Sequence, residues 1–424
     1  MIDRKKGPAI TTDFDLELRG IRQSQLPNGL PVHEFNSGTQ NIIKVALVYR
    51  TGRIHERRRA TAKAALSLIR EGSTRHSSEE LAEVYDYYGA VVKTSVTMET
   101  CSVSLVVVER YFAEVWPIWF HMVFYPMYDS EELEKYKQVT ASKFVRQLAK
   151  NDVQGYRKLT EALFGADHPY GYNTEVEDIQ ALDREDLLGY YNECLGLDDA
   201  FLVLSGSYSE ATRTQICTDL GQKKRHNKLP PVVYDQQPLS SEVLKISTDK
   251  DVQVSIKMGR RLFERKHPDF PAMRFLNLIL GGYFGSRLMK NIREDKGYTY
   301  GIYSSVHSWR KDGFIYISAE VANDYLDPTL KEIHKEMERL RDTIVPEAEM
   351  EMVRNYILGQ TLHLLDGPFA KGELIMNLQK NHRTIDDFHA GIDHARTITA
   401  DTLQQMAQKY LDPADYLTVL TGQL

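Results

Sequence analysis

The length, composition and charge of the chain exclude several classes of protein. With 424 residues the chain is too long for one ordinary hydrophobic core, which stops growing at about 250 to 300 residues, so two domains are expected. Apolar residues make up 42% and charged residues 26%, as in a soluble globular protein. The formal charge of −6 and the scattered Lys and Arg argue against nucleic acid as a partner, because phosphate binding needs a concentrated basic face.

Cysteine content and the apolar segments predict a cytoplasmic chain without a membrane partner. Cys101, Cys194 and Cys217 have no CxxC spacing, which excludes a cysteine zinc site and a disulfide framework and favours a reducing compartment. Residues 1–20 are basic but lack the apolar run of a signal peptide. The aromatic run at residues 115–128 contains two prolines and is too short to span a bilayer, so we expect a buried helix and a turn there.

The first half begins, in chain order, with predicted strands and continues with helices. Asn28 and Gly29 give a hairpin signal within LPNGLPV, and the apolar run IIKVALVYRTG follows at residues 42–52. His55 and Glu56, in the charged segment IHERRR, are interpreted as a solvated surface. The alanines of residues 60–67 favour a helix, and residues 131–137 open a long one.

The second half repeats the pattern of the first at an offset near 216 residues. Residues 182–206 and 398–422 both predict an N-capped amphipathic helix, a loop with Asp and a short apolar strand. The run at residues 103–108 similarly resembles that at 316–321, and the helix start at 131–137 resembles that at 347–354. We interpret this as one αβ unit used twice.

This repeat predicts an α+β fold of two homologous domains, each a mainly antiparallel sheet covered by helices on one face. The polar, proline-bearing segment GQKKRHNKLPPVVYDQQPLSS has the character of an exposed linker. We therefore place the domains at residues 1–225 and 239–424, joined by a linker at residues 226–238.

The stretch from Gly281 to Gly301 is the strongest candidate for chemistry. Gly281, Gly282 and Ser286 lead into a predicted helix, and Gly297 is expected to turn the chain into a strand. Such a turn could bring together Arg293 and Tyr300, whose donors can hold a peptide carbonyl or a developing oxyanion. A helix C-cap with a surface arginine and a core tyrosine also explains these residues, and composition alone favours it.

This stretch resembles the C-terminal-half signature of the M16 metallopeptidases, the inverzincins related to mitochondrial processing peptidase and insulysin. LPNGLPV, the EGST of residues 71–74, the HPYG of residues 168–171 and the repeated halves strengthen the resemblance. It implies that each chain is half of a clamshell. It also implies that Arg293 and Tyr300 hold the substrate backbone, with Gly281, Gly282 and Ser286 as substrate-binding positions.

The zinc motif that the resemblance implies is missing. The family carries HxxEH shortly before EGST, and Lys63, Leu66 and Ser67 stand at the three motif positions. A one-residue slide gives Ala64, Ser67 and Leu68 instead. The third ligand is expected within residues 135–151, which contain no Asp or Glu. The chain alone is therefore expected to bind no metal or other cofactor and to hydrolyse nothing.

The resemblance implies that the water-activating zinc comes from a partner, a homologous subunit with HxxEH. That partner would act on an unfolded oligopeptide, while Arg293 and Tyr300 of this chain grip it in trans. A purely structural or peptide-binding role is the alternative function, and an independent peptidase with unorthodox ligands is the third. Whether the chain also forms a homodimer stays open.

Overall fold

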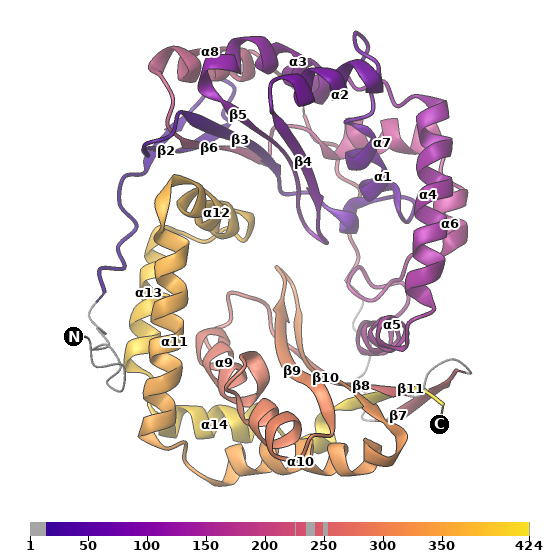
Figure 1. Cartoon of the computed structure of the whole chain (residues 1–424), viewed down its shortest axis with the longest axis vertical. Coiled ribbons are helices and arrows are strands. Elements are labelled where there is room, and N and C mark those ends of the chain that lie inside the picture. The colour runs from indigo at the N-terminus through magenta and orange to yellow at the C-terminus, as the bar shows by residue number, and fades with distance from the viewer. Residues whose placement is uncertain (1–13, 225, 235–241, 249–252, 424) are drawn as a thin grey trace, which may run out of the picture.

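The computed structural model describes residues 14–224, 226–234, 242–248 and 253–423. It contains two β-sheets, one in each half of the chain, with helices around both (Figure 1). The described part of the predicted linker, residues 226–234, is neither helix nor strand. Its remaining residues, 235–238, and the boundary position 225 lie outside the described residues.

The first sheet has the strand order β1-β2-β6-β3-β5-β4. Its strands are β1 (Arg22–Gln25), β2 (Pro31–Asn36), β3 (Ile42–Tyr49), β4 (Val91–Val96), β5 (Cys101–Val108) and β6 (Ala200–Gly206). All pairings are antiparallel except that of β2 with β6. The predicted hairpin is confirmed, since β1 pairs with β2 and Gly29 has a φ of 88°, which glycine adopts without strain.

The helices of the first half pack on one face of this sheet around a large apolar core. Those that do so are α1 (Thr61–Leu68), α2 (Ser78–Tyr87), α3 (Phe112–Phe124), α4 (Ser130–Leu148), α6 (Val176–Gln180), α7 (Arg184–Cys194) and α8 (Glu210–Gly221), whereas α5 (Asn151–Phe164) packs on the sheet of the other half. The aromatic run at residues 115–128 is the buried helix and turn that was predicted, with Trp116 and Trp119 stacked at 5.2 Å. Within the described residues, no helix has the length and apolarity to cross a membrane.

The second sheet has the order β7-β11-β8-β10-β9 and is antiparallel except for β7 with β11. Its strands are β7 (Val243–Ser247), β8 (Gln253–Leu262), β9 (Thr299–Ser308), β10 (Gly313–Ala322) and β11 (Leu417–Gly422). The helices are α9 (Phe270–Asn277), α10 (Leu326–Asp342), α11 (Glu347–Leu365), α12 (Gly367–Lys380), α13 (Ile385–Thr397) and α14 (Ala400–Tyr410). Two π-helical turns, Leu278–Gly282 and Met289–Asp295, lie between α9 and β9.

The repeat seen in the sequence holds in three dimensions. α14 begins and ends 216 residues after α7, and β11 ends 216 residues after β6. Asp183 caps α7 and Thr399 caps α14 through their side-chain oxygens, as the sequence pattern predicts. The α+β architecture of two related sheets with helices is therefore confirmed.

Each half also lends one helix to the sheet of the other half, which the sequence did not predict. α12 packs on β2, β3 and β6 of the first sheet, and α5 packs on β8 and β11 of the second (Figure 1). Gly155 and Gly372 allow close approach, since a Cβ would lie 3.1 Å from Lys257 Cγ and 2.9 Å from Ser205 Oγ, respectively. Both sheets are thus covered on their second face as well, by a helix from the other half.

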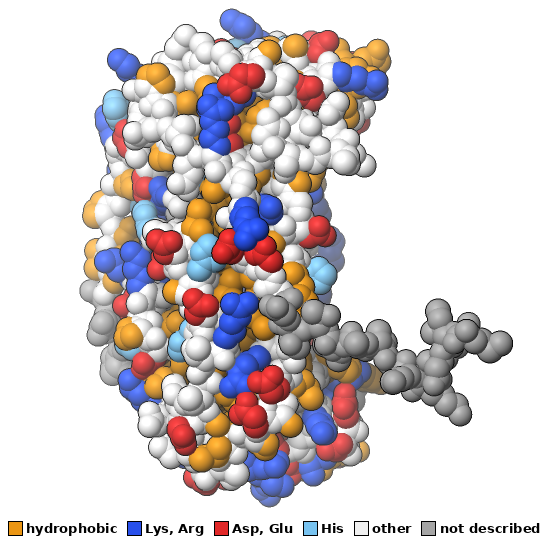
Figure 2. All heavy atoms as spheres, turned by 90° about the vertical axis from the view of Figure 1, so that its left-hand side faces the viewer, with side chains coloured by type: hydrophobic (Ala, Val, Ile, Leu, Met, Phe, Trp, Pro, Cys, Tyr) orange, Lys and Arg blue, Asp and Glu red, His pale blue; other side chains and the backbone are white. Residues whose placement is uncertain are grey.

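Charged side chains are distributed over the surface rather than concentrated. On the face turned to the viewer in Figure 2, the described Lys and Arg side chains alternate with Asp, Glu and apolar ones. Many are paired, as in Lys409 with Asp269 at 2.7 Å. This face lacks, among its described residues, the concentrated basic patch on which phosphate binding depends.

Candidate functional site

The turn that carries Arg293 and Tyr300 forms as predicted. The π-helical turn Met289–Asp295 ends at Lys296, and Gly297 takes a φ of 68°, the left-handed conformation that favours glycine. The Tyr298 amide then donates to the Ile292 carbonyl at 3.0 Å, and β9 begins at Thr299. Single π-turns are often found at functional sites because they shift side chains out of regular helical register.

Arg293 and Tyr300 meet through the backbone rather than through their two functional groups. Arg293 Nε donates to the Tyr300 carbonyl at 3.0 Å, and the guanidinium lies over the Phe284 ring, 4.8 Å from its centroid. The Tyr300 residue is 94% exposed. The phenol is thus presented to solvent rather than packed as a core tyrosine, while the guanidinium is oriented by two neighbours.

The strand edge beside Tyr300 is irregular. β9 pairs with β10, and the register shifts between Ala319 and Val321, so that Glu320 lies opposite two residues, Tyr300 and Gly301. Such a bulge bends an edge strand and redirects its side chains, a device common next to active sites. It accounts for the outward projection of the tyrosine.

The glycines and serine predicted to bind substrate pack the turn against β9. A Cβ on Gly281 would lie 2.6 Å from Ser304 N, and one on Gly282 would lie 2.8 Å from Asn277 Nδ2. Ser286 is 1% exposed, and its hydroxyl finds no hydrogen-bond partner among the described residues. In this structure these residues therefore position the Arg293 turn from the inside, and their contact with substrate stays a prediction.

A cavity of about 310 Å³ opens beside Tyr300, between α5 of the first half and the second sheet. Its lining consists of Asp152, Gln253, Thr299, Tyr300, Gly301, Tyr303, Ser318, Ala319 and Glu320. Behind it, Lys257 is 1% exposed and pairs with Asp152 and Ser318. The exchanged helix α5 therefore contributes a wall of the same cavity that Tyr300 lines. No sequence pattern indicates this neighbour, which lies in the other half of the chain.

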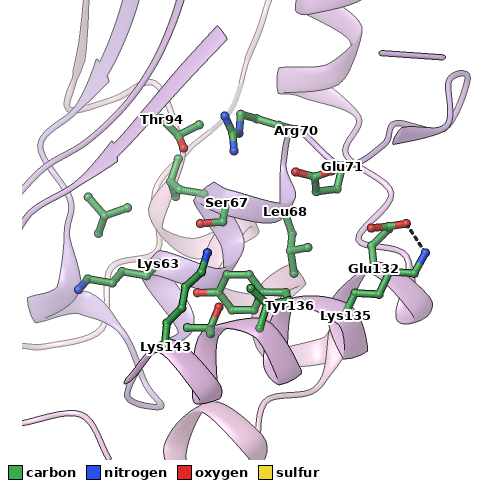
Figure 3. A pocket seen from close by; sticks show the side chains of 14 residues that line it. Lys63, Ser67, Leu68, Arg70, Glu71, Thr94, Glu132, Lys135, Tyr136 and Lys143 are labelled. Atoms are coloured by element: carbon green, nitrogen blue, oxygen red, sulfur yellow. Dashed lines mark hydrogen bonds and ion pairs between the residues drawn. The ribbon is translucent and has the colours of Figure 1, made fainter. Parts of the chain in front are cut away.

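The three positions of the missing zinc motif lie together on α1, the helix predicted at residues 60–67. Lys63, Leu66 and Ser67 line a cavity of about 610 Å³ between α1, α4 and β4 (Figure 3), which we call the α1–α4 pocket. The other lining residues are Leu68, Arg70, Glu71, Thr94, Val96, Glu132, Lys135, Tyr136, Val139, Thr140 and Lys143. The predicted ligand-bearing segment, residues 135–151, thus faces α1 as the resemblance implies.

The residues of the α1–α4 pocket do not fit a zinc ion. Leu66 is fully buried and supplies no ligand, and the neutral hydroxyl of Ser67 is not one of the Cys, His, Asp or Glu ligands that bind zinc. Desolvation, followed by the charge of Arg53, lowers the pKa of the Lys63 ammonium, and the Glu56 carboxylate opposes both effects. Throughout the part of the chain that the structure describes, no group of three or more His, Cys, Asp or Glu is arranged to hold a metal.

The interpretation of His55 and Glu56 as solvated surface is wrong. His55 is 8% exposed, and the side chain of Glu56 is 1% exposed. The Glu56 carboxylate accepts from the Ala62 amide at 2.9 Å and from the Tyr172 hydroxyl, so it caps the N-terminus of α1. Burial raises the pKa of this carboxyl despite the nearby charge of Arg53. The charged residues around Glu56 in the sequence led to the wrong prediction of an exposed side chain.

Comparisons with known proteins agree with this geometry. Residues 181–357 match the family model described as Peptidase M16 inactive domain. The chain is 21% identical over 411 residues to a protein of Bacillus subtilis (strain 168) named "Uncharacterized zinc protease YmxG", covering 94% of this chain and 98% of that protein. It is 20% identical over 255 residues to "Probable inactive metalloprotease YmfF" of the same organism, covering 59% of this chain and 58% of that one.

The fold is also found in a solved structure. The crystal structure of a peptidase M16 inactive domain from Pseudomonas fluorescens superposes with a TM-score of 0.87 at 17% identity, over 96% of this chain and 99% of that one. These matches, with the unfit metal positions, support an M16 homologue without catalytic activity of its own. The chain is a homologue of the M16 peptidases and carries the inactive domain of that family at residues 181–357.

Proposed function

We propose that this protein is the non-catalytic subunit of a two-chain zinc metalloendopeptidase. A homologous subunit with HxxEH supplies the zinc, and this chain supplies Arg293 and Tyr300 in trans. The substrate is an unfolded oligopeptide in an extended conformation. The free state of the three cysteines, two of them buried, supports a cytoplasmic location for the pair.

The exposure of Tyr300 is the observation that carries this proposal. A large aromatic side chain that is 94% exposed buries nothing and adds nothing to the stability of the isolated chain. Its position beside an arginine held at its own carbonyl, at the start of an edge strand, is instead suited to contact with another molecule. Among the described residues of the α1–α4 pocket, no three His, Cys, Asp or Glu are arranged to hold a metal, so this chain needs a partner to hydrolyse a peptide.

The chemistry assigned to the two side chains follows from their donors. Nε of Arg293 is used in holding the turn and Nη1 lies 4.0 Å from Glu294 Oε1, so that Nη2 remains to bind a carbonyl. The Tyr300 hydroxyl supplies one further donor to the oxygen that becomes negative when water attacks the scissile carbon. Zinc in the partner, when bound, would polarise that carbonyl and activate the water.

The exposed backbone of the sheet edges supports binding of an extended peptide. Among the described strands, β9 pairs with β10 alone and β4 pairs with β5 alone. β4 therefore presents unpaired amide and carbonyl groups, to which an extended peptide can add as a further strand. On β9, in contrast, the Tyr300 and Ser304 carbonyls already accept from the Arg293 and Asn277 side chains. Backbone pairing of this kind gives affinity with little dependence on sequence.

A mixed-complex assay tests this function. The chain is combined with a homologous M16 subunit that carries HxxEH, and cleavage of an unfolded oligopeptide is followed. Tyr300→Phe is expected to lower kcat by about 10²- to 10³-fold, the usual loss for one oxyanion donor. Tyr87→Phe, at a residue 81% exposed on α2, is the matched control and keeps full activity.

Full activity of the Tyr300→Phe complex would contradict the catalytic role of the phenol. If the two chains associate and the variant binds and cleaves as the wild type does, the chain serves as a structural or peptide-binding homologue instead. If no association with a zinc-bearing subunit is detected by light scattering, the two-chain proposal fails as a whole.

A further inference from the structure

The α1–α4 pocket is unusual in its charge. Four cationic side chains, Lys63, Arg70, Lys135 and Lys143, line it against two carboxylates, Glu71 and Glu132. The whole chain has a formal charge of −6, so this excess of positive charge opposes the overall balance. A cation is disfavoured at this place and an anion is favoured.

Both carboxylates already have partners. Glu132 pairs with Lys135 at 3.0 Å, and Lys135 also reaches Glu131 at 3.0 Å. Glu71 accepts a hydrogen bond from the Ser78 hydroxyl at 2.7 Å. Glu132 is therefore paired with a cation at the rim, whereas Glu71 keeps its negative charge, and the four cations still outnumber the two carboxylates.

Three of the cations, in contrast, have no ion pair or hydrogen bond among the described residues. Lys63 and Arg70 come from α1 and the loop after it, and Lys143 comes from α4. In Figure 3 the Lys143 side chain rises from α4 toward Ser67, and the Arg70 guanidinium lies beside Thr94. All three side chains line the cavity without a side-chain partner in the described part of the chain, although the Lys63 ammonium points away from the other two in this view, so their donors are available to a ligand.

The remaining lining suits the other parts of an amino-acid side chain. Leu66, Leu68, Val96 and Val139 provide apolar walls for an alkyl stem. The hydroxyls of Thr94 and Thr140 add neutral hydrogen-bonding capacity around the cations. A cavity of about 610 Å³ leaves room for one side chain with its hydration water.

The pocket also lies at a free sheet edge. Thr94 and Val96 line it and are two residues apart on β4, so they project from the same face of that edge strand. A peptide paired along β4 would carry every second side chain over the same face. One of these peptide side chains could therefore enter the pocket.

From these observations we propose that the α1–α4 pocket is a carboxylate-binding subsite that selects an acidic side chain of an extended peptide. The inference rests on the proposed function only in treating the chain as a peptide binder. Lys63, Arg70 and Lys143 bind the carboxylate through charge-assisted hydrogen bonds, which are about twice as strong as neutral ones. The resemblance implies a metal cation at this position, whereas the residues present suit an anionic group of the substrate.

Peptide binding to the isolated full chain tests the proposal without any zinc-bearing partner. The probes are two fluorescein-labelled, acetylated peptides of equal length, one with Glu and one with Gln at alternate positions. Anisotropy titration is expected to give the Glu peptide at least about 10-fold tighter binding, an ordinary gain for hydrogen bonds to a charged group. Rising salt is expected to reduce this preference, because the pocket is open to solvent.

Charge-removing variants assign the preference to the pocket. Lys63→Gln and Lys143→Gln are each expected to reduce the Glu-over-Gln preference about three-fold or more, and the double variant to abolish it. Lys331→Gln removes an exposed charge from α10 and keeps the preference intact. Circular dichroism of each variant checks that the fold is unchanged, as expected for exposed lysines.

Three outcomes would overturn the inference. They are equal or undetectable binding of the two peptides, an unchanged preference in the double variant, and a phosphoserine peptide that binds while the Glu peptide gains nothing over Gln. Because no partner takes part, failure here leaves the Arg293 and Tyr300 proposal standing. Loss of the Tyr300→Phe effect in the mixed complex, conversely, leaves the binding preference untouched.

Discussion

The two halves of the molecule place the same framework around different chemistry. β4 and β9 are corresponding edge strands, each paired with one neighbour among the described residues. Beside β4 lies a cationic pocket whose described residues form no group of three metal ligands, and at the start of β9 stands an exposed phenol next to an oriented guanidinium. The fold therefore holds both edges in place independently of whether either performs catalysis.

The two exchanged helices, α5 and α12, also differ in how deeply their ion pairs with the opposite sheet are buried. On the second sheet, α5 places Asp152 against Lys257, which is 1% exposed. On the first sheet, α12 places Glu373 against Lys44, whose side chain is 18% exposed. A buried ion pair depends strongly on both partners, whereas an exposed one contributes little. The α5 contact is thus expected to be the more sensitive of the two.

The largest expected effect comes from filling the space beside the Arg293 turn. Gly281→Val would place a Cβ 2.6 Å from Ser304 N, and the backbone there cannot move aside without disturbing β9. We expect a loss of about 3 kcal/mol or more in the free energy of unfolding. Denaturant unfolding followed by fluorescence measures it.

Gly301→Ala is the matched control for that substitution. A Cβ on Gly301 would meet no atom within 4 Å, and Gly301 lies in β9, the edge strand that also contains Ser304. A change within about 0.5 kcal/mol is expected. If both substitutions cost the same, the packing explanation for Gly281 is wrong and the turn is stabilised by something else.

The next effect compares the exchanged helices directly. Asp152→Asn leaves the Lys257 ammonium buried without its carboxylate, and we expect a loss of about 2 kcal/mol in the free energy of unfolding, reduced because Asp152 is half exposed. Glu373→Gln, on the corresponding helix, is expected to cost less than about 0.5 kcal/mol. The same unfolding experiment measures both.

A double-mutant cycle separates the ion pair from other effects of these substitutions. Asp152→Asn with Lys257→Met is expected to cost less than the two single changes added together, because the second change removes the stranded charge. Strict additivity would show that α5 is held to the second sheet by its apolar contacts alone.

Part of the fold and of the candidate site could be predicted from the sequence, for specific physical reasons. The helix and strand of residues 182–206 and 398–422 carry their caps, apolar faces and terminal glycines within one short segment, so local signals suffice. Gly297 likewise predicts its own turn, because a glycine after a helix favours the left-handed conformation. The exchange of α5 and α12 could not be predicted, because an amphipathic helix does not indicate which of two sheets it covers.

The site residues that were missed share a cause. Glu56 stands among arginines, and sequence gives no sign that its carboxylate turns inward to cap α1. The pairing of Arg293 Nε with a backbone carbonyl also leaves no pattern, because every residue has a carbonyl. In contrast, Lys63, Leu66 and Ser67 were located correctly on one helix face, since helical spacing alone determines that.

The pH dependence of stability is expected to include a contribution from His55. Burial, and then the charge of Arg310, lowers the pKa of His55 to about 4 from its usual 6.5. Below pH 6.5 the unfolded chain therefore binds a proton that the folded chain does not. Stability falls as pH falls, by on the order of 1 to 2 kcal/mol between pH 7 and pH 5 for this residue.

Comparing His55→Gln with the wild type across this range isolates that contribution. The variant is expected to be less stable at pH 7, since the Gly52 amide donates to His55 Nδ1 at 3.3 Å, but to lose less on acidification. If the stabilities of the two proteins change in parallel between pH 7 and pH 5, His55 takes up its proton equally in the folded and the unfolded state.

The smallest effect tests whether the α1–α4 pocket has lost only its ligands or also its geometry. Lys63→His/Ser67→His places two imidazoles four residues apart on one face of α1, the spacing that zinc-binding helices use. At zinc concentrations about five times the Kd of the variant, binding is expected to stabilise it by about 1 kcal/mol, with no effect on the wild type. Thermal unfolding with and without zinc measures this, and magnesium is the control ion. An unchanged melting temperature in the variant would mean that α1 and α4 no longer present a metal-sized gap, and that the difference between the two halves extends from side chains to backbone.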